Sequence, residues 1–205
     1  MILVTGGLGF IGSHIALSLL ARGHEIVIVD NLANSTLQTL ERLEYISGMY
    51  IPFAKLDVRN TPALNKVFEQ YSIDAVIHTA SFKSLEESVL KPLEYYNDNV
   101  SCIMSLLRAM QRMGVRQLIN LSSVAVYGKS DSELSEETEF NYHYANPYIV
   151  PSKWWRILLR IPTGLTMNGR SLTCGYPILS VPLSMGYWVN MLFNYRRILC
   201  LWPCR

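Results

Sequence analysis

The amino-acid sequence predicts an α/β protein whose core is a doubly wound parallel sheet. Two observations carry this prediction. Short apolar runs of strand length alternate with longer segments of helical spacing over the first 149 or so of the 205 residues. A glycine-rich turn also separates the first apolar run from the first helical segment. Strands that are joined through helices run parallel, so we expect helices on both faces of the sheet.

Five strands and four helices are expected in this part of the chain. The strand segments are short and apolar, and most are rich in β-branched residues; they are residues 2–5, 25–29, 50–56, 74–78 and 117–121. The helical segments repeat apolar residues at three- and four-residue spacing; they are residues 10–22, 35–47, 62–71 and 92–113. Pro62 and Pro92 open two of these helices, and Gly23 and Gly114 follow two of them as stop signals.

The turn from Thr5 to Gly12 lies between the first strand and the first helix. Gly6 is expected to permit a tight turn, Gly9 to let the backbone approach a pyrophosphate, and Gly12 to let helix and strand pack closely. The helix N-terminus would then face the anion. Asp30 ends the second strand, where a carboxylate would accept hydrogen bonds from an adenosine ribose and repel a 2′-phosphate. This arrangement predicts a Rossmann-type domain that binds NAD rather than NADP.

Polar residues at the ends of later strands extend the candidate site. Asp57 and Val58 follow the third strand, where they could border the adenine of the dinucleotide. A polar residue is also common at the end of a strand that binds no ligand. The hydroxyl of Ser123, after the fifth strand, is expected in the ligand crevice. Tyr148 follows 25 residues later. A phenol acts as a base at neutral pH only if its pKa, ordinarily about 10, is lowered by nearby positive charge; without such a partner Tyr148 is an ordinary amphipathic residue.

The overall composition excludes several classes of function. A net charge of only +2 argues against a nucleic-acid-binding surface. The four Cys residues are spaced neither as a zinc site nor as a disulfide framework, so no metal is expected. The first residues run directly into the glycine turn without the basic segment or cleavage site of an export signal, so we expect a cytoplasmic protein.

The composition changes after residue 149. Residues 150–205 contain no Asp or Glu, yet they hold seven Lys and Arg, all four Trp and three of the four Cys. No sustained period follows Pro147, so we predict that residues 150–205 form no authentic substrate domain and fold poorly. The uncharged stretch 171–195 has the hydropathy of a membrane span, but prolines and a glycine interrupt it, so no membrane partner is expected.

Several motifs resemble those of the extended short-chain dehydrogenase/reductase family. They are the turn from Thr5 to Gly12, Asp30-Asn31-Leu32, Ser122-Ser123 before Val126-Tyr127-Gly128, and Asn146-Pro147-Tyr148. Further motifs narrow the resemblance to the UDP-glucose 4-epimerases. The resemblance covers residues 1–149 nearly without gaps. These motifs are Asn34-Ser35 after Asp30-Asn31-Leu32, Lys83 with Glu87-Ser88, and Lys91 to Tyr96. Other nucleotide-sugar epimerases and the 4,6-dehydratases remain alternatives.

The resemblance implies a role for each matching residue. Ser123 would hydrogen-bond the sugar 4-oxygen, and Tyr148 would be the base. UDP-glucose and UDP-galactose would interconvert through a 4-keto sugar, with hydride carried by bound NAD. Such enzymes are usually homodimers, and the sequence leaves open whether UDP-N-acetylglucosamine is also a substrate. The expected NAD-binding residues are Gly6, Gly9, Gly12, Asp30, Asn31, Asp57, Val58, Ala80, Lys83 and Asn99.

The sequence departs from the family pattern directly after Tyr148. The family has Tyr-x-x-x-Lys, which places an ammonium one helical turn from the phenol. Here residue 152 is Ser, and Lys153 lies five places on, rotated about 100° further round a helix. Pro151 also disfavours helical geometry at Val150. Lys153 is therefore a poor substitute for the missing lysine.

A one-base deletion explains this departure and the change in composition together. One coding of Tyr-Ile-Arg-Ser-Lys-Gln-Met-Val-Glu becomes the codons for Tyr148 to Arg156 when a single C is removed from the Arg codon. Read one base earlier, the codons for Met185 to Asn190 can encode Gly-Leu-Leu-Gly-Glu, which also resembles an epimerase segment. The sequence thus favours a frame-shifted tail and an inactive chain that can at most bind NAD. An active epimerase and a membrane-tethered dehydrogenase are the competing hypotheses.

Overall fold

The computed structural model describes residues 1–127 and 146–152 and the backbone of residues 171–176. Its centre is a six-stranded parallel sheet in the order β3-β2-β1-β4-β5-β6. The strands are β1 (Ile2–Thr5), β2 (Ile26–Asp30), β3 (Phe53–Lys55), β4 (Ala75–His78), β5 (Gln117–Ser123) and β6 (Ser171–Tyr176). The chain winds outward in both directions from the β1–β4 pair, which places a ligand crevice at the carboxyl ends of these strands.

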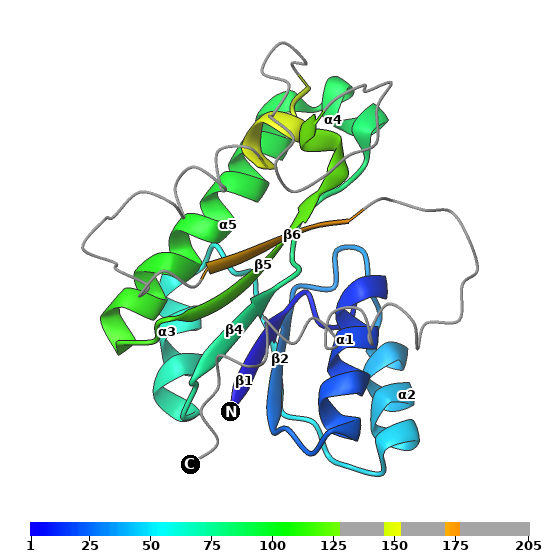
Figure 1. The fold of residues 1–205 in the computed structure, drawn as a ribbon, viewed down its shortest axis with the longest axis vertical. Coiled ribbons are helices and arrows are strands. Elements are labelled where there is room, and N and C mark those ends of the chain that lie inside the picture. The colour runs from blue at the N-terminus through cyan, green and yellow to red at the C-terminus, as the bar shows by residue number, and fades with distance from the viewer. Residues whose placement is uncertain (128–145, 153–170, 177–205) are drawn as a thin grey trace.

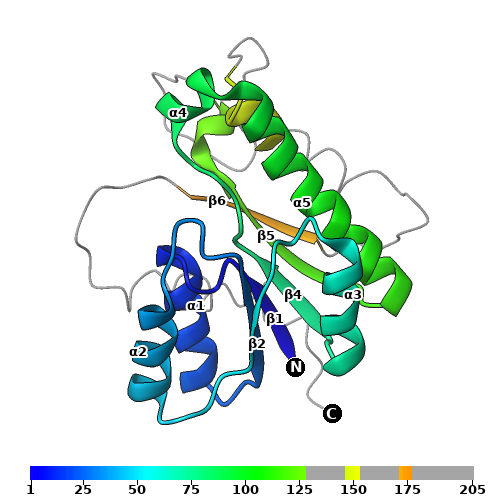
Figure 2. The same cartoon turned by 180° about the vertical axis from the view of Figure 1, so that it is seen from behind.

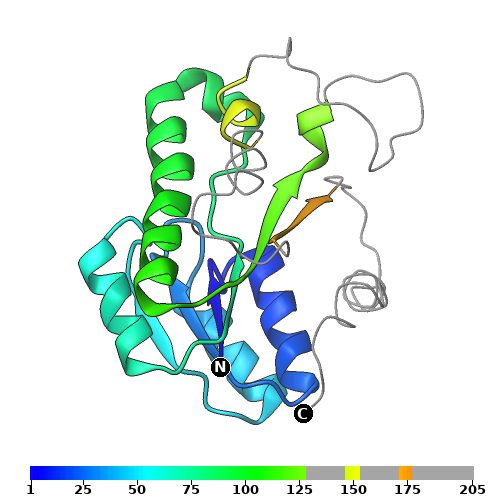
Figure 3. The same ribbon diagram turned by 60° about the vertical axis from the view of Figure 1, so that its left-hand side comes forward.

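Helices cover both faces of this sheet, as Figures 1 and 2 show from opposite sides. One layer packs against each face, and Figure 3 shows α1 and α5 on opposite sides of the strands. The first layer consists of α1 (Phe10–Ala21) and α2 (Leu37–Ser47), and the second of α3 (Thr61–Gln70) and α5 (Pro92–Met113). The short α4 (Leu85–Leu90) precedes α5.

Alternation along each strand divides the core into two clusters. Leu3 and Val76 face the α3 and α5 layer, whereas Val4 and Ile77 face the α1 and α2 layer. All four side chains are buried, because successive side chains of a strand point to opposite faces and both faces are covered. The apolar runs of the sequence are therefore strands buried on both sides.

The structure confirms the predicted Rossmann-type fold and its alternation. Each of the five expected strands and four expected helices is present, with bounds that move by a few residues; β3, for example, is shorter than the segment 50–56. The helix α4 was not predicted from the sequence. Ser84 caps this helix by accepting a hydrogen bond from the Glu87 amide at 3.1 Å. A helix of six residues is too short to display a helical period in the sequence.

The sequence shows no sustained pattern after Pro147, whereas the structure has a strand at residues 171–176. That residues 150–205 form no authentic substrate domain stays a prediction. Residues 171–176 form β6, which pairs in parallel with β5 from Leu118 to Ser123. Backbone groups at the edge of a sheet can pair with an extended segment whatever its side chains are. Of the predicted tail, residues 153–170 and 177–205, which include Lys153 and most of the uncharged stretch 171–195, lie outside the described residues. Among the described helices, none has the length and apolar character that a membrane crossing requires.

The N-terminus of α3 provides a test of local stability. The Asn60 side chain accepts a hydrogen bond from the Ala63 amide at 3.2 Å, whereas Thr36, at the same position of α2, makes no such bond. We expect Asn60→Ala to lower the free energy of unfolding by about 1 kcal/mol. Thr36→Ala should change it by less than about 0.5 kcal/mol. Urea unfolding of both variants checks this, and equal losses would contradict the capping role.

Candidate functional site

A pocket of about 120 Å³ lies at the carboxyl ends of β1 to β4, where the winding of the sheet reverses. This is the place where doubly wound sheets bind ligands. Most of the residues expected to bind a dinucleotide line it: Gly6, Gly9, Asp30, Asn31, Asp57, Val58, Ala80 and Asn99. The structure thus brings together residues that are up to 93 positions apart in the sequence.

At Gly6 and Gly12 the backbone of the glycine turn packs too closely against other backbone atoms to leave room for a side chain. Gly6 has φ of +69°, and a Cβ there would lie 2.7 Å from the backbone nitrogen of Ala80. A Cβ on Gly12 would overlap the carbonyl oxygen of Gly6. At Gly9 a Cβ would meet only that carbonyl oxygen, at 3.3 Å. Gly6 and Gly12 therefore permit the close packing of the turn, whereas Gly9 lines the pocket at the N-terminus of α1.

The Asp30 carboxylate fixes the turn next to the pocket. It is buried and accepts hydrogen bonds from the amides of Leu8 at 3.0 Å and Leu32 at 2.9 Å, and from the Ser35 hydroxyl at 2.8 Å. A carboxylate has about four acceptor positions. One position therefore remains for a donor in the pocket, such as a ribose hydroxyl.

Arg59 links two carboxylates at the opposite wall of the pocket. Its Nε and one terminal nitrogen donate to Asp57 at 2.9 and 2.7 Å, and its other terminal nitrogen pairs with Asp98 on α5. The hydrogen bond from the Arg59 side chain is the main reason that the pKa of Asp57 falls to about 2. Burial raises the pKa of the neighbouring Cys102 thiol to about 12.

The Asp57–Arg59 pair predicts a pH dependence of stability. A carboxyl whose pKa is lowered in the folded state stabilises the fold above its ordinary pKa of 3.8, and loses that contribution as the pH falls towards about 2. We therefore expect Asp57→Asn to be less stable than the unaltered chain at pH 7, with a difference that shrinks between pH 4 and pH 2. Urea unfolding at several pH values measures this, and a difference independent of pH would contradict it.

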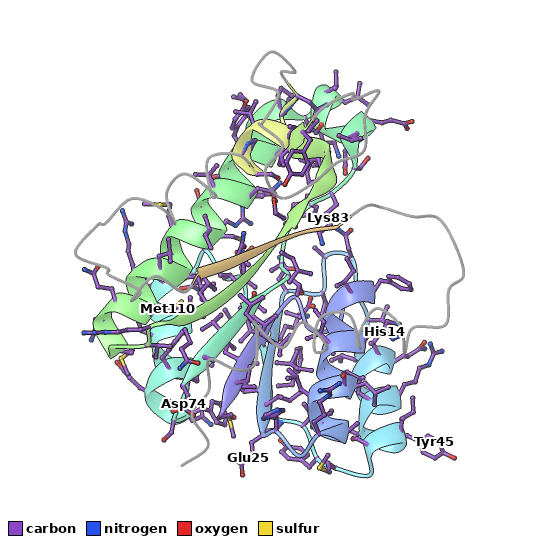
Figure 4. The ribbon with its side chains drawn as sticks, in the orientation of Figure 1. His14, Glu25, Tyr45, Asp74, Lys83 and Met110 are labelled. Atoms are coloured by element: carbon purple, nitrogen blue, oxygen red, sulfur yellow. The ribbon has the colours of Figure 1, made fainter. Side chains whose placement is uncertain are left out.

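The loop after β4 is held by α5. Asn99 is buried, and its amide binds both backbone groups of Phe82, accepting from the nitrogen at 2.9 Å and donating to the oxygen at 3.1 Å. The Tyr95 hydroxyl accepts from the Ser84 amide at 3.2 Å. Between these contacts lies Lys83, whose pKa is lowered by burial. Figure 4 shows Lys83 at one end of the sheet and Asp74 and Glu25, which precede β4 and β2, at the other end. Lys83 is not among the residues that line the pocket.

Ser123 and Tyr148 lie together at the same edge of the sheet. Ser123 ends β5, and its hydroxyl accepts from the Ala125 amide at 3.2 Å. Tyr148 packs against Ala125 and Phe82, close enough for the Ser123 hydroxyl to influence the pKa of its phenol. Asn146 begins the helical turn that carries Tyr148, because its side chain accepts from the Tyr148 amide at 2.8 Å. The Ser88 hydroxyl, on α4, lies 3.1 Å from the same Asn146 oxygen. Burial raises the pKa of Tyr148, and the Ser123 hydroxyl opposes this only in part.

A family model described as the NAD dependent epimerase/dehydratase family matches residues 2–151. The chain belongs to this family. Its relatives include the UDP-glucose 4-epimerase of Neisseria meningitidis serogroup C, which is 49% identical over 127 residues, 62% of this chain and 38% of the relative. The UDP-glucose 4-epimerase of Bacillus subtilis is 42% identical over 147 residues, 72% of this chain and 43% of the relative. The chain thus spans roughly two fifths of the length of these two curated relatives.

Solved structures of UDP-glucose 4-epimerases share the fold. The enzyme of Stenotrophomonas maltophila, with bound NAD and formylated UDP-arabinopyranose, matches with a TM-score of 0.78 and 37% identity. That match covers 85% of this chain and 52% of the other. The enzyme of Bifidobacterium longum, in complex with NAD+ and UDP, matches with a TM-score of 0.75 and 39% identity over 78% of this chain and 48% of the other.

This member of the epimerase/dehydratase family has a serine one helical turn after Tyr148. Ser152 is buried, and its hydroxyl donates to the Tyr148 carbonyl oxygen at 3.0 Å. Residues 149–152 are helical, so position 152 does lie one turn from Tyr148. The described structure therefore places a hydroxyl that binds backbone, and not an ammonium, at this position. Lys153 lies outside the described residues.

Several residues that line the pocket were not among the expected site residues, and they include Arg59, Asp98 and Cys102. Arg59 stands two places after Asp57, within the reach of its side chain, so the pair could have been found in the sequence. Asp98 and Cys102 lie on α5, far from Asp57 in the sequence. They reach the pocket only because α5 packs against this face of the sheet, which the sequence pattern does not show.

Proposed function

We propose that residues 1–149 bind NAD in the pocket between the glycine turn and Asp57. The residues present fit this group in two respects. Gly9 leaves the N-terminus of α1 open to a pyrophosphate, and Asp30 keeps one acceptor position for a ribose hydroxyl. The negative charge of Asp30 disfavours a 2′-phosphate, so NAD should bind more tightly than NADP. The family description, which names NAD dependence, supports the same cofactor.

The reacting part of the cofactor would lie toward Lys83, Ser123 and Tyr148. Bound NAD would supply the hydride acceptor for oxidation at a sugar carbon. Asn99 fixes the backbone that carries Lys83 and so orients this ammonium. Although burial lowers the pKa of Lys83, the Lys83 side chain can still donate a hydrogen bond to the cofactor. The order of residues along the edge of the sheet would thus follow the length of the dinucleotide.

Ser123 and Tyr148 would act on a nucleotide sugar. We propose UDP-glucose and UDP-galactose as the substrates of the intact enzyme type, because the curated relatives are UDP-glucose 4-epimerases. Ser123 would donate to the sugar 4-oxygen, and Tyr148 would accept the proton of the 4-hydroxyl. The observation that carries this function is the packing of Tyr148 against Phe82, which lines the glycine pocket, and against Ala125, two residues after Ser123.

The chain as written should not turn over these sugars. Proton acceptance at neutral pH requires a lower pKa of Tyr148, and here burial raises it. The position from which an ammonium would stabilise the phenolate holds Ser152, whose hydroxyl is engaged with backbone. Tyr148 is therefore a neutral hydrogen-bonding group in this chain. NAD binding without epimerisation is the function that these residues support.

We also propose that residues 150–205 are read out of frame and are not a substrate domain. The support is the codon relation at Tyr148 to Arg156, the absence of Asp and Glu after residue 149, and the family match that stops at residue 151. The domain that binds NAD would then consist of residues 1–149. Sequencing of the gene and its transcript across these codons tests the reading frame directly.

Calorimetric titration of the full chain with NAD and NADP, with an assay of UDP-galactose conversion, tests the function. We expect NAD to bind at least about tenfold more tightly than NADP, and no conversion above a Tyr148→Phe control. Failure to bind NAD would refute the cofactor proposal. Conversion that disappears in Tyr148→Phe would refute the proposed inactivity.

A further inference from the structure

The Arg59 side chain joins two segments that come from different faces of the pocket. Asp57 lies in the turn after β3, and Asp98 lies on α5. Arg59 pairs with both carboxylates, and all three residues line the pocket. The Asp98 and Arg59 side chains are only 18% and 34% exposed, so solvent screens these pairs less than it screens pairs on the surface. Neither Arg59 nor Asp98 is needed for the proposed chemistry, yet together they fix one wall of the site.

The hydrogen bonds of Asp57 show what Arg59 does to this carboxylate. Arg59 supplies three donors: its amide and Nε to Oδ1, both at 2.9 Å, and a terminal nitrogen to Oδ2 at 2.7 Å. The fourth contact comes from the Asn31 side-chain nitrogen to Oδ2, at 3.3 Å. That contact is the longest of the four and therefore the weakest. An N–H donor of a ligand in the pocket can replace it without disturbing the contacts from Arg59.

We propose that Arg59, tethered by Asp98, is a positioning residue that aims Oδ2 of Asp57 at the purine amine of the bound dinucleotide. This inference rests on the proposed binding of NAD. The bidentate pair prevents rotation of the carboxylate and keeps it ionised, so that it accepts a hydrogen bond and cannot donate one. The pocket therefore selects a 6-amino purine over a 6-keto purine, whose oxygen would face a fixed negative charge.

The test compares NAD with nicotinamide hypoxanthine dinucleotide, which carries a keto oxygen in place of the adenine amine. Calorimetric titration of the full chain should give about tenfold tighter binding of NAD, the effect of one hydrogen bond to a charged acceptor. In Arg59→Met the ratio of the two dissociation constants should fall towards one. Arg112→Met is the matched control, because Arg112 pairs with Glu69 on the surface at 3.7 Å, and it should keep the ratio of the unaltered chain.

The ratio separates positioning from a general loss of structure. If Arg59→Met weakens both dinucleotides by the same factor, Arg59 only supports the fold and the inference is wrong. If the unaltered chain binds both dinucleotides equally, the inference is wrong although NAD binds. If it binds neither, the proposed function fails and the inference fails with it. Should Arg59→Met not fold, Asp98→Leu removes the acceptor of the tether with little change of size, and an unchanged ratio in that variant overturns the proposal.

Discussion

A Gly12→Ala chain is expected to lose about 3 kcal/mol or more of its free energy of unfolding. The added Cβ would overlap the Gly6 carbonyl oxygen and would lie 2.8 Å from the Gly7 Cα. Both neighbours are backbone atoms of the turn, which is held by Asp30 and by the bond from the Gly6 amide to Val29. The turn cannot move aside without breaking these contacts. Urea unfolding followed by circular dichroism measures the loss.

Gly9→Ala is the matched control within the same turn. Its backbone has φ of −70°, which any residue adopts, and the new Cβ would meet only one atom, at 3.3 Å. We expect its stability to stay within about 1 kcal/mol of the unaltered chain. Its affinity for NAD should nevertheless fall by at least tenfold, because the methyl group would occupy the space proposed for the pyrophosphate. Equal stability losses in the two variants would contradict the different roles assigned to these glycines.

Ser152→Lys is expected to lower the pKa of Tyr148 by about 1 or more. The substitution places an ammonium one helical turn from the phenol, and positive charge stabilises the phenolate, so the pKa moves downward. In the present chain burial moves it upward. Carbon-13 labelling of the tyrosine ring, with Tyr148 assigned through a Tyr148→Phe spectrum, allows this titration to be followed by NMR among the 12 tyrosines.

Ser152→Met separates charge from size in that experiment. Methionine is similar in length to lysine but carries no charge, and it also removes the hydrogen bond from Ser152 to the Tyr148 carbonyl oxygen. We expect the pKa of Tyr148 in this variant to stay at or above its value in the unaltered chain. A decrease as large as that in Ser152→Lys would mean that the substitution acts by opening the site to solvent. The added ammonium would then not explain the lower pKa in Ser152→Lys.

The sequence predicted those parts of the fold that depend on local pattern. The buried strands β1, β2 and β4 are continuous apolar runs, and the long helix α5 begins at Pro92 and ends at Met113 as expected, with Gly114 at φ of +71° after it. The short α4 gave no such pattern. β6 was also missed, because its pairing with β5 depends on backbone groups and not on a pattern of side chains.

Those parts of the candidate site were predictable in which a single residue type is required by the local backbone. The backbone of Gly6 and the crowding at Gly12 follow from the spacing of the turn. The proximity of Ser123 and Tyr148 depends on how β5 and the turn at Asn146 meet, and only the family resemblance suggested it. The link from Arg59 to Asp98 was invisible in the sequence, because 39 residues separate the two side chains that the packing of α5 brings together.

Restoring the reading frame tests the central claim most directly, namely that an intact NAD-binding half has lost catalysis at the turn after Tyr148. The gene with one base inserted after the Ile149 codon, translated to its new stop, would be compared with the gene as written for conversion of UDP-galactose to UDP-glucose. We predict NAD binding by both products and conversion by the restored product alone. Conversion by the chain as written, at a rate within about tenfold of the restored product, would contradict the account.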